Sequence, residues 1–190
     1  MKKIYIEEET FEKIDFSNEP LQPGEYENCS FVNCNFSNVD LSEINFAECI
    51  FSDCNFTMTT LAKTALKTIS FKQCKLMGLH FEHCNEFLFE VQFSHCKLEF
   101  VSFYSMKIKK TKFENCELKE VDFTNADLTA AIFSNSNLEG SIFENTIIEK
   151  ADFSSAINFT IDPEQNYIKK AKFANESLAG LLQKYDLDIQ

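Results

Sequence analysis

A bulky apolar residue recurs at every fifth position through most of this chain. A first run of such centres extends unbroken through Phe11, Phe16, Leu21, Tyr26, Phe31, Phe36, Leu41, Phe46, Phe51, Phe56, Leu61, Leu66, Phe71, Leu76 and Phe81. A second run extends through Leu88, Phe93, Leu98, Phe103, Ile108, Phe113, Leu118, Phe123, Leu128, Phe133, Leu138, Phe143, Ile148 and Phe153. The step from Phe81 to Phe93 is two repeats plus two extra residues. A period of five fits neither an α-helix nor a plain strand.

The position two residues before each centre follows a rule of its own. All eight Cys of the chain occupy it, with Cys84 preceding the slipped position Glu86, and Ala, Val or Ile fills it in many other repeats. Asn or Asp often stands directly before the centre, as in Asn35, Asp40 and Asp122. Each repeat therefore reads as a small or apolar residue, a polar residue, Phe or Leu, and then two polar residues.

This pattern resembles the motif of the pentapeptide-repeat family, A(D/N)LXX, over roughly residues 11–175. The resemblance implies an all-β solenoid, a right-handed quadrilateral β-helix in which four repeats make one coil of 20 residues. In that family the centre and the residue two before it point inward. We therefore expect residues 1–175 to form the β-helix, with a two-residue register slip near 84–90. Residues 176–190 are expected to form a C-terminal helix or tail.

Charged residues provide a separate test of the 20-residue coil. Residues 20 apart would stack about 4.8 Å from each other on adjacent coils, where opposite charges attract and like charges repel. Opposite charges meet at Glu43/Lys63, Glu90/Lys110, Lys97/Glu117, Lys107/Asp127 and Glu99/Lys119/Glu139. Neither run contains a like-charge stack. The charges therefore support the coil length that the Phe pattern suggests.

The cysteines and histidines are the candidate ligands of the chain. A spacing of 20 relates Cys29/Cys49, Cys34/Cys54/Cys74 and Cys96/Cys116, which would suit disulfides or a metal site. We interpret these thiols as buried packing residues instead, because they occupy inward positions and no CxxC spacing occurs. His80, His83 and His95 fall on outward positions. We predict no catalytic, cofactor-binding or metal-binding residues, and hence a protein that is not an enzyme.

The extra residues and the C-terminus are candidate contact sites. Phe87, Phe89 and Phe100 fall off the inward positions, so they either form an exposed contact bulge or fold back against the coil. Near the C-terminus Asn175 or Ser177 is a candidate cap of a short helix. Its apolar residues recur at helical spacing, and such a helix would cap the solenoid or mediate a homodimer. These apolar residues are Leu178, Leu181, Leu182 and Tyr185.

The net charge of the chain indicates which kinds of partner it can bind. The chain carries −12 overall, with an excess of acids in residues 1–60 and 113–190 and an excess of Lys in residues 61–112. A charge this negative argues against direct binding to nucleic acid and favours a protein partner with a basic groove. No apolar segment follows Met1-Lys2-Lys3, and none approaches the roughly 20 residues of a membrane span. We therefore expect a cytoplasmic protein with no membrane partner.

The resemblance also suggests a function. The Cys-rich motifs 31–36 and 51–56, the internal slip and the segments 161–163 and 168–173 are most similar to bacterial quinolone-resistance and microcin-immunity proteins. This implies a DNA mimic that binds gyrase or topoisomerase IV and protects it from a drug or peptide toxin. The alternative is a general protein-interaction scaffold with no topoisomerase role. The acids expected to bind are Asp15, Glu25, Glu27, Asp40, Glu48 and Asp53 at one end, and Glu114, Asp122, Glu144, Glu149 and Asp152 at the other.

Overall fold

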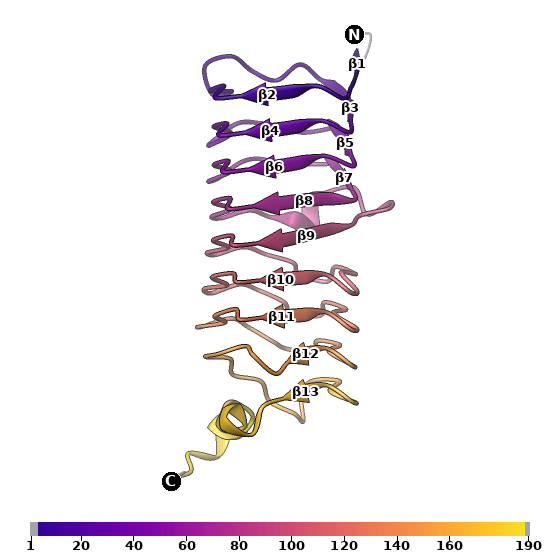
Figure 1. Ribbon diagram of the computed structural model, residues 1–190. Coiled ribbons are helices and arrows are strands. Elements are labelled where there is room, and N and C mark those ends of the chain that lie inside the picture. Colours follow the sequence, from indigo (N-terminus) through magenta and orange to yellow (C-terminus); the bar gives the residue numbers. More distant parts are fainter. Residues whose placement is uncertain (1–3, 189–190) are drawn as a thin grey trace.

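The computed structural model describes residues 4–188, which form a parallel β-solenoid of about eight coils with one short C-terminal helix (Figure 1). One side of the coil is a four-stranded sheet of β1 (Ile4–Glu7), β3 (Gly24–Glu27), β5 (Asn45–Ala47) and β7 (Ala65–Lys67). The next side is a nine-stranded sheet of β2 (Thr10–Glu12), β4 (Ser30–Val32), β6 (Ile50–Ser52), β8 (Ile69–Lys72), β9 (Val91–Ser94), β10 (Lys112–Glu114), β11 (Ile132–Ser134), β12 (Asp152–Phe153) and β13 (Lys172–Phe173). The predicted fold class is confirmed.

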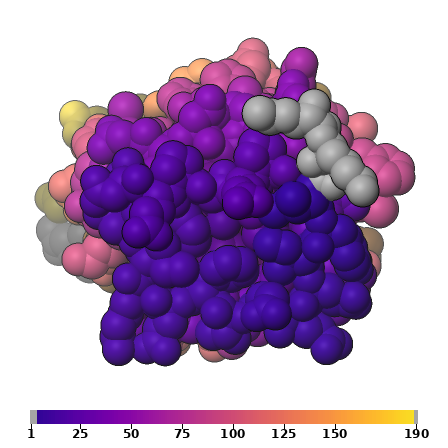
Figure 2. Space-filling model, turned by 90° about the horizontal axis from the view of Figure 1, so that it is seen from above, coloured from indigo at the N-terminus to yellow at the C-terminus, as the bar shows by residue number. Residues whose placement is uncertain are grey.

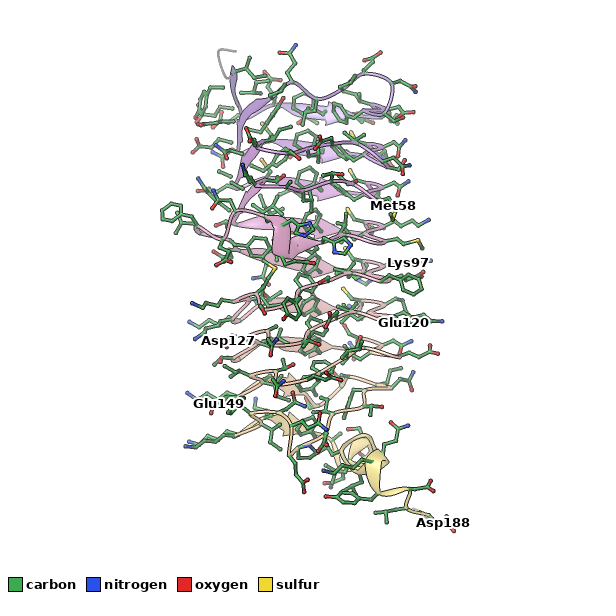
Figure 3. The ribbon with its side chains drawn as sticks, turned by 180° about the vertical axis from the view of Figure 1, so that it is seen from behind. Met58, Lys97, Glu120, Asp127, Glu149 and Asp188 are labelled. Carbon is green, nitrogen blue, oxygen red and sulfur yellow. The ribbon has the colours of Figure 1, made fainter. Side chains whose placement is uncertain are left out.

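Each complete coil has four sides, which we name by their central residues in the second coil. The four-stranded sheet lies on the Tyr26 face and the nine-stranded sheet on the Phe31 face. Backbone bridges such as Asn35–Asn55 and Asp40–Thr60 continue the 20-residue register on the other two sides, the Phe36 face and the Leu41 face. Because the chain visits the sides in this order, the Leu41 face lies opposite the Phe31 face. Figure 3 views the molecule from behind, onto the Leu41 face.

Stacked aromatic rings fill the solenoid. On the Phe31 face, rings separated by one coil stack with centroids 4.6–5.5 Å apart from Phe11 to Phe173. Rings on neighbouring faces meet edge to face, as Phe31 and Phe36 do at 5.7 Å. At the N-terminal end the side chains of the first coil close the interior (Figure 2). The interior is therefore a packed core rather than a channel.

The turns explain how a β-rich chain manages with four Gly. The residue two after a centre adopts a left-handed conformation in nearly every repeat, with φ of 54° at Asn33, 62° at Glu43 and 60° at Lys110. Gly78 and Gly140 occupy the same position. The repeated turn is imposed by the coil on many residue types, so it does not depend on glycine.

The pairing offset changes from 20 to 22 residues at the insertion. Ala65 pairs with Asn85, whereas Ile69 pairs with Val91. The intervening turn is closed by the Phe87 N–H, which donates to Asn85 Oδ1 at 2.9 Å. Figure 1 shows this segment, in pink, projecting from the coil at the level of β8 and β9. The stacked rings of the Phe31 face continue past it without interruption.

The prediction that Leu88 faces the interior is wrong. Its side chain is 64% exposed, and Phe89 packs against the core instead, with its ring 6.0 Å from that of Phe81. The physical reason is that the loop that leaves the coil spans residues 86–88 and so includes Leu88, and the chain rejoins the coil at Phe89 and Glu90. Phe89, next but one to the buried Val91, is then the apolar side chain that reaches the interior.

Few of the charge stacks are ion pairs. Among residues 4–188, the Glu43/Lys63 stack closes to 3.8 Å, whereas Asp127 pairs with Lys109 at 3.0 Å rather than with Lys107. Exposed lysines reach several neighbours, so coil register does not select one partner. Across the insertion the shifted register pairs Lys75 with Lys97, a like-charge stack.

The C-terminal segment consists of three short helical turns. These are η2 (Asn175–Ser177), α1 (Ala179–Leu182) and η3 (Gln183–Tyr185); a further 3-10 turn, η1 (Phe81–His83), lies within the coil. The predicted caps are wrong: Asn175 and Ser177 lie inside η2, and neither helix start has a side-chain cap. Leu181 packs against the core, and the Ile161 N–H donates to the Gly180 carbonyl at 3.0 Å. The segment therefore docks on the last coil.

Candidate functional site

Charge is distributed unevenly among the four faces. The Leu41 face carries the carboxylates of Asp40, Glu43, Glu82, Asp122, Glu144, Asp162 and Glu164, and among the coil residues 4–175 it carries only one lysine, Lys63. The Phe31 face carries Lys13, Lys72, Lys112 and Lys172, and the Phe36 face carries Lys75, Lys97 and Lys119. The Tyr26 face carries Lys67, Lys107, Lys109, Lys110, Lys150, Lys169 and Lys170. The Leu41 face is therefore the acidic face of the molecule.

The coil holds the carboxylates of the acidic face in a fixed row. The Asp40 carboxylate accepts hydrogen bonds from the Ser42 N–H at 2.9 Å and from the Ser42 hydroxyl, which lower the pKa of Asp40 below its ordinary value. Asp122 accepts the Thr124 N–H at 2.8 Å in the same turn. From Asp40 to Asp162 the row spans about 29 Å, since each coil advances about 4.8 Å.

Two groups moderate the charge of this face. Glu82 contacts the His80 ring, with Nδ1 and Oε1 2.9 Å apart, and its second carboxylate oxygen is buried without a partner. At the C-terminal end Lys184 contacts Asp162 at 2.8 Å and Glu164 at 2.7 Å. These contacts lower the pKa of both carboxyls and hold η3 on the last coil. Since Glu43 contacts Lys63, the acids named above that take part in no ion pair within residues 4–188 are Asp40, Asp122 and Glu144.

The eleven acids singled out in the sequence are exposed or half-buried, but they do not form one surface. The acidic face brings together Asp40, Asp122 and Glu144. The Phe31 face carries Asp53, Glu114 and Asp152, the Tyr26 face carries Glu25, Glu27, Glu48 and Glu149, and the Phe36 face carries Asp15. Sequence reasoning missed Glu43, Glu82, Asp162 and Glu164. Sorting the charges by position within a 20-residue period would have found them.

The predicted contact bulge is only partly assembled. Phe87 is 67% exposed on the Tyr26 face, and Phe89 folds back against the core. Phe100 is also exposed, but it follows Leu98 on the Phe36 face, across the solenoid from Phe87. At the C-terminus Leu178, Leu182 and Tyr185 are exposed, while Leu181 is half-buried. The structure thus separates Phe100 from the bulge.

The remaining candidate ligands are internal. All eight Cys are buried free thiols, and burial raises the pKa of Cys49 and Cys84 to about 12. Over residues 4–188, no group of three or more His, Cys, Asp or Glu is placed to hold a metal ion. Within the same range no helix is long and apolar enough to cross a membrane.

Comparison with known proteins gives matches of two kinds. A family model described as "Pentapeptide repeat region" matches residues 25–86 and 75–153. No curated protein sequence matches. The full-length structure of QnrB1, a plasmid-mediated fluoroquinolone resistance protein, matches with a TM-score of 0.55 at 16% identity, over 97% of this chain and all of that chain. One trypsin-treated QnrB1 variant matches with a TM-score of 0.51 at 19% identity, over 99% of this chain and 98% of its own. A second trypsin-treated variant matches with a TM-score of 0.50 at 19% identity, over the whole of both chains. At these identities the structural likeness shows the fold.

Proposed function

This chain belongs to the pentapeptide-repeat family, and on that premise we propose that it is a non-catalytic, cytoplasmic DNA mimic. Its partner is a type II topoisomerase, gyrase or topoisomerase IV, which it protects from poisoning by a quinolone or a peptide toxin. The observation that carries the proposal is the concentration of carboxylates on one face of a rigid rod. The likeness in fold to QnrB1, described as a fluoroquinolone resistance protein, supports the choice of partner.

The acidic face has the physical properties that a duplex-binding groove recognises. A duplex advances about 3.4 Å per phosphate along each strand, so a row of about 29 Å matches roughly eight phosphates. The solenoid fixes the carboxylates in advance, so little conformational entropy is lost when they meet a basic groove. Such binding depends on long-range charge and weakens as salt is added.

The test is a supercoiling assay of gyrase, with and without a fluoroquinolone, in which the protein is titrated. We expect restored supercoiling at protein concentrations that do not themselves inhibit the enzyme. The charge-reversed variant Asp40→Lys/Asp122→Lys should lose this protection, because it replaces two carboxylates of the acidic face with positive charges. Direct binding to gyrase, measured by surface plasmon resonance, should weaken by more than tenfold in that variant.

A matched control separates the acidic face from net charge. The variant Asp15→Lys/Asp152→Lys makes the same change of charge at the same repeat position. Both of these aspartates accept the N–H and hydroxyl of the serine two residues later, but they lie on other faces. This control should retain protection. If both variants lose protection equally, net charge rather than the acidic face is responsible. If the unaltered protein has no effect on gyrase or topoisomerase IV even at low salt, the proposal fails.

A second candidate function is a protein-interaction scaffold with no topoisomerase role. The exposed Phe87 and Leu88 at the insertion favour it, because exposed apolar side chains gathered at one place on a soluble surface commonly mark a contact site. A homodimer through the exposed Leu178, Leu182 and Tyr185 is compatible with either function. Sedimentation that detects only a monomer would remove the dimer.

A further inference from the structure

The insertion builds an apolar projection on the Tyr26 face. Phe87 and Leu88 are 67% and 64% exposed, although the next residue, Phe89, is half-buried. Figure 1 shows the loop standing out from an otherwise smooth coil. Burial of both side chains by a partner would remove their apolar surface from water, which favours association.

Lysines line a groove beside this projection. The groove has a volume of about 670 Å³ and is bordered by Leu88 and Phe89 and by the side chains of Lys67, Lys107, Lys109 and Lys110. The Lys67 amine lies 6.0 Å from the centroid of the Phe87 ring, within the range of a cation–π contact. The acids at the groove are Glu48 and Glu90, and Glu90 accepts the Thr68 hydroxyl at 3.3 Å.

Three of these four lysines take part in no ion pair within residues 4–188. Lys109 is paired with Asp127 at 3.0 Å. Within residues 4–188, Lys67, Lys107 and Lys110 have no carboxylate oxygen within 4.0 Å. In a protein with a net charge of −12, a groove of this kind is the part of the surface to which an anion is drawn.

We propose that the insertion and this groove form a docking site for a short acidic peptide segment of a partner protein, one that carries a large apolar side chain. The acidic groups of the segment pair with Lys107 and Lys110, and its apolar side chain packs on Phe87 and Leu88. The site does not depend on the acidic face or on a topoisomerase.

The length of the basic band favours a peptide over a nucleic acid. The lysines occupy the coils of Lys67 and Lys107–Lys110, and the neighbouring coils of this face carry Glu48 on one side and Asp127 on the other. Two coil steps span about 10 Å, which three extended residues cover. A duplex following the rod would place phosphates against the acids on both sides.

The experiment measures binding of a fluorescein-labelled peptide, Asp-Glu-Leu-Phe-Glu-Asp, to the full chain by fluorescence anisotropy. We expect saturable binding that Lys107→Glu/Lys110→Glu weakens by at least tenfold. Phe87→Ser/Leu88→Ser should weaken binding at high salt as well as low, because it removes apolar contact. Amide shifts in NMR spectra on peptide addition should be confined to the insertion and the groove, at residues 47–48, 67–68, 86–92 and 107–110.

The chain offers a closely matched control. Lys150→Glu/Lys170→Glu reverses two lysines on the same face, and Lys110, Lys150 and Lys170 share the left-handed turn position, with φ of 59–61°. This variant should bind the peptide normally. If the Lys107/Lys110 variant fails to fold by circular dichroism, Lys107→Gln/Lys110→Gln replaces it. Equal weakening by both charge reversals, no binding at about 1 mM peptide, or stronger binding of a short DNA duplex at the same site would each overturn the proposal.

Discussion

The residue two positions before each inward centre does more than fill space. The Cys54 thiol donates to the Phe31 carbonyl of the preceding coil at 3.4 Å, and the Thr64 hydroxyl donates to the Leu41 carbonyl at 2.8 Å in the same arrangement. Ser136 does the same to Phe113 at 3.0 Å. Cys, Ser and Thr therefore share one role at this position, as small side chains that donate to the coil before.

The thiols should accordingly be inert in the native protein. Cys49 and Cys84 are buried, and burial raises their pKa to about 12, so both remain protonated at pH 8. Because the thiolate is the reactive form, we expect no reaction of either with DTNB at pH 8 until denaturant is added. Mass spectrometry after brief alkylation identifies the modified positions. Rapid labelling of either residue in the folded protein would contradict this assignment.

Stability should depend sharply on whether an aromatic residue lies in a ring column. Phe113 is fully buried, with its ring centroid 5.2 Å from that of Phe93 and 4.9 Å from that of Phe133. Phe113→Ala should lower the free energy of unfolding by about 3–5 kcal/mol, measured by urea denaturation. The exposed Phe87 is the control, and Phe87→Ala should change the free energy of unfolding by about 0.5 kcal/mol or less. Similar losses in both variants would refute the column as the source of stability.

At the scale of the coil, the five-residue period predicted the ring columns but not the path of the insertion. A count of positions shows that two residues are extra between Phe81 and Phe93, but it cannot show which two leave the coil. Counting back from Phe93 selected Leu88, whereas the structure exposes Leu88 and buries part of Phe89. The choice depends on side-chain packing against Phe81, which the period does not contain.

Deleting Glu86 and Phe87 should restore an uninterrupted repeat. Asn85 would then directly precede Leu88, which becomes an inward centre two residues after Cys84. Burial of Leu88, worth about 1.5–3 kcal/mol, offsets the lost packing of Phe89, so we expect a folded protein of similar stability. The deletion should abolish binding of the acidic peptide while leaving gyrase protection intact. Thermal denaturation checks the first expectation; an unfolded deletion variant would show that the insertion is required by the coil.

The docking of the C-terminal segment depends on Gly180. A Cβ added there would lie 2.4 Å from the Phe159 carbonyl oxygen and 2.9 Å from its ring, and a backbone oxygen cannot move aside. Gly180→Ala should therefore displace α1 from the last coil, despite the better helix propensity of Ala. Hydrogen exchange should show faster exchange at Ile161, whose N–H donates to Gly180. The exposed Ala179 provides the control, Ala179→Ser, which should leave that exchange unchanged.

At the scale of the whole molecule, the charged residues can be ordered in two ways, by position along the chain or by position on the coil. Summing charges along the chain identifies acidic ends and a Lys-rich middle, and this placed the candidate acids on all four faces. Sorting the same charges by coil position separates the acidic face, with Asp40 and Asp122 in one column, from the lysine groove beside the insertion. The first order needs only the sequence. The second needs the coil length and the position of the two-residue slip, because an error there moves every later residue to another place on the coil.

The aspartates that accept hydrogen bonds within the repeated turn should retain their charge for as long as the solenoid remains folded. The pKa values of Asp15, Asp40 and Asp152 are held below their ordinary value by hydrogen bonds from the serine two residues later. In the unfolded chain the pKa of an Asp carboxyl is near 3.9. A lower pKa in the folded state stabilises the fold at any pH well above 3.9, and this stabilisation is lost as pH falls through the folded-state pKa values. We expect unfolding free energy, measured with urea, to vary little with these groups between pH 7 and about 5, and to fall below about pH 4. The variant Ser17→Ala/Ser42→Ala/Ser154→Ala removes the hydroxyl donors and should flatten that decline. A decline of equal steepness in the variant would mean that other carboxyls govern acid unfolding, and that the turn does not hold these charges on the surface.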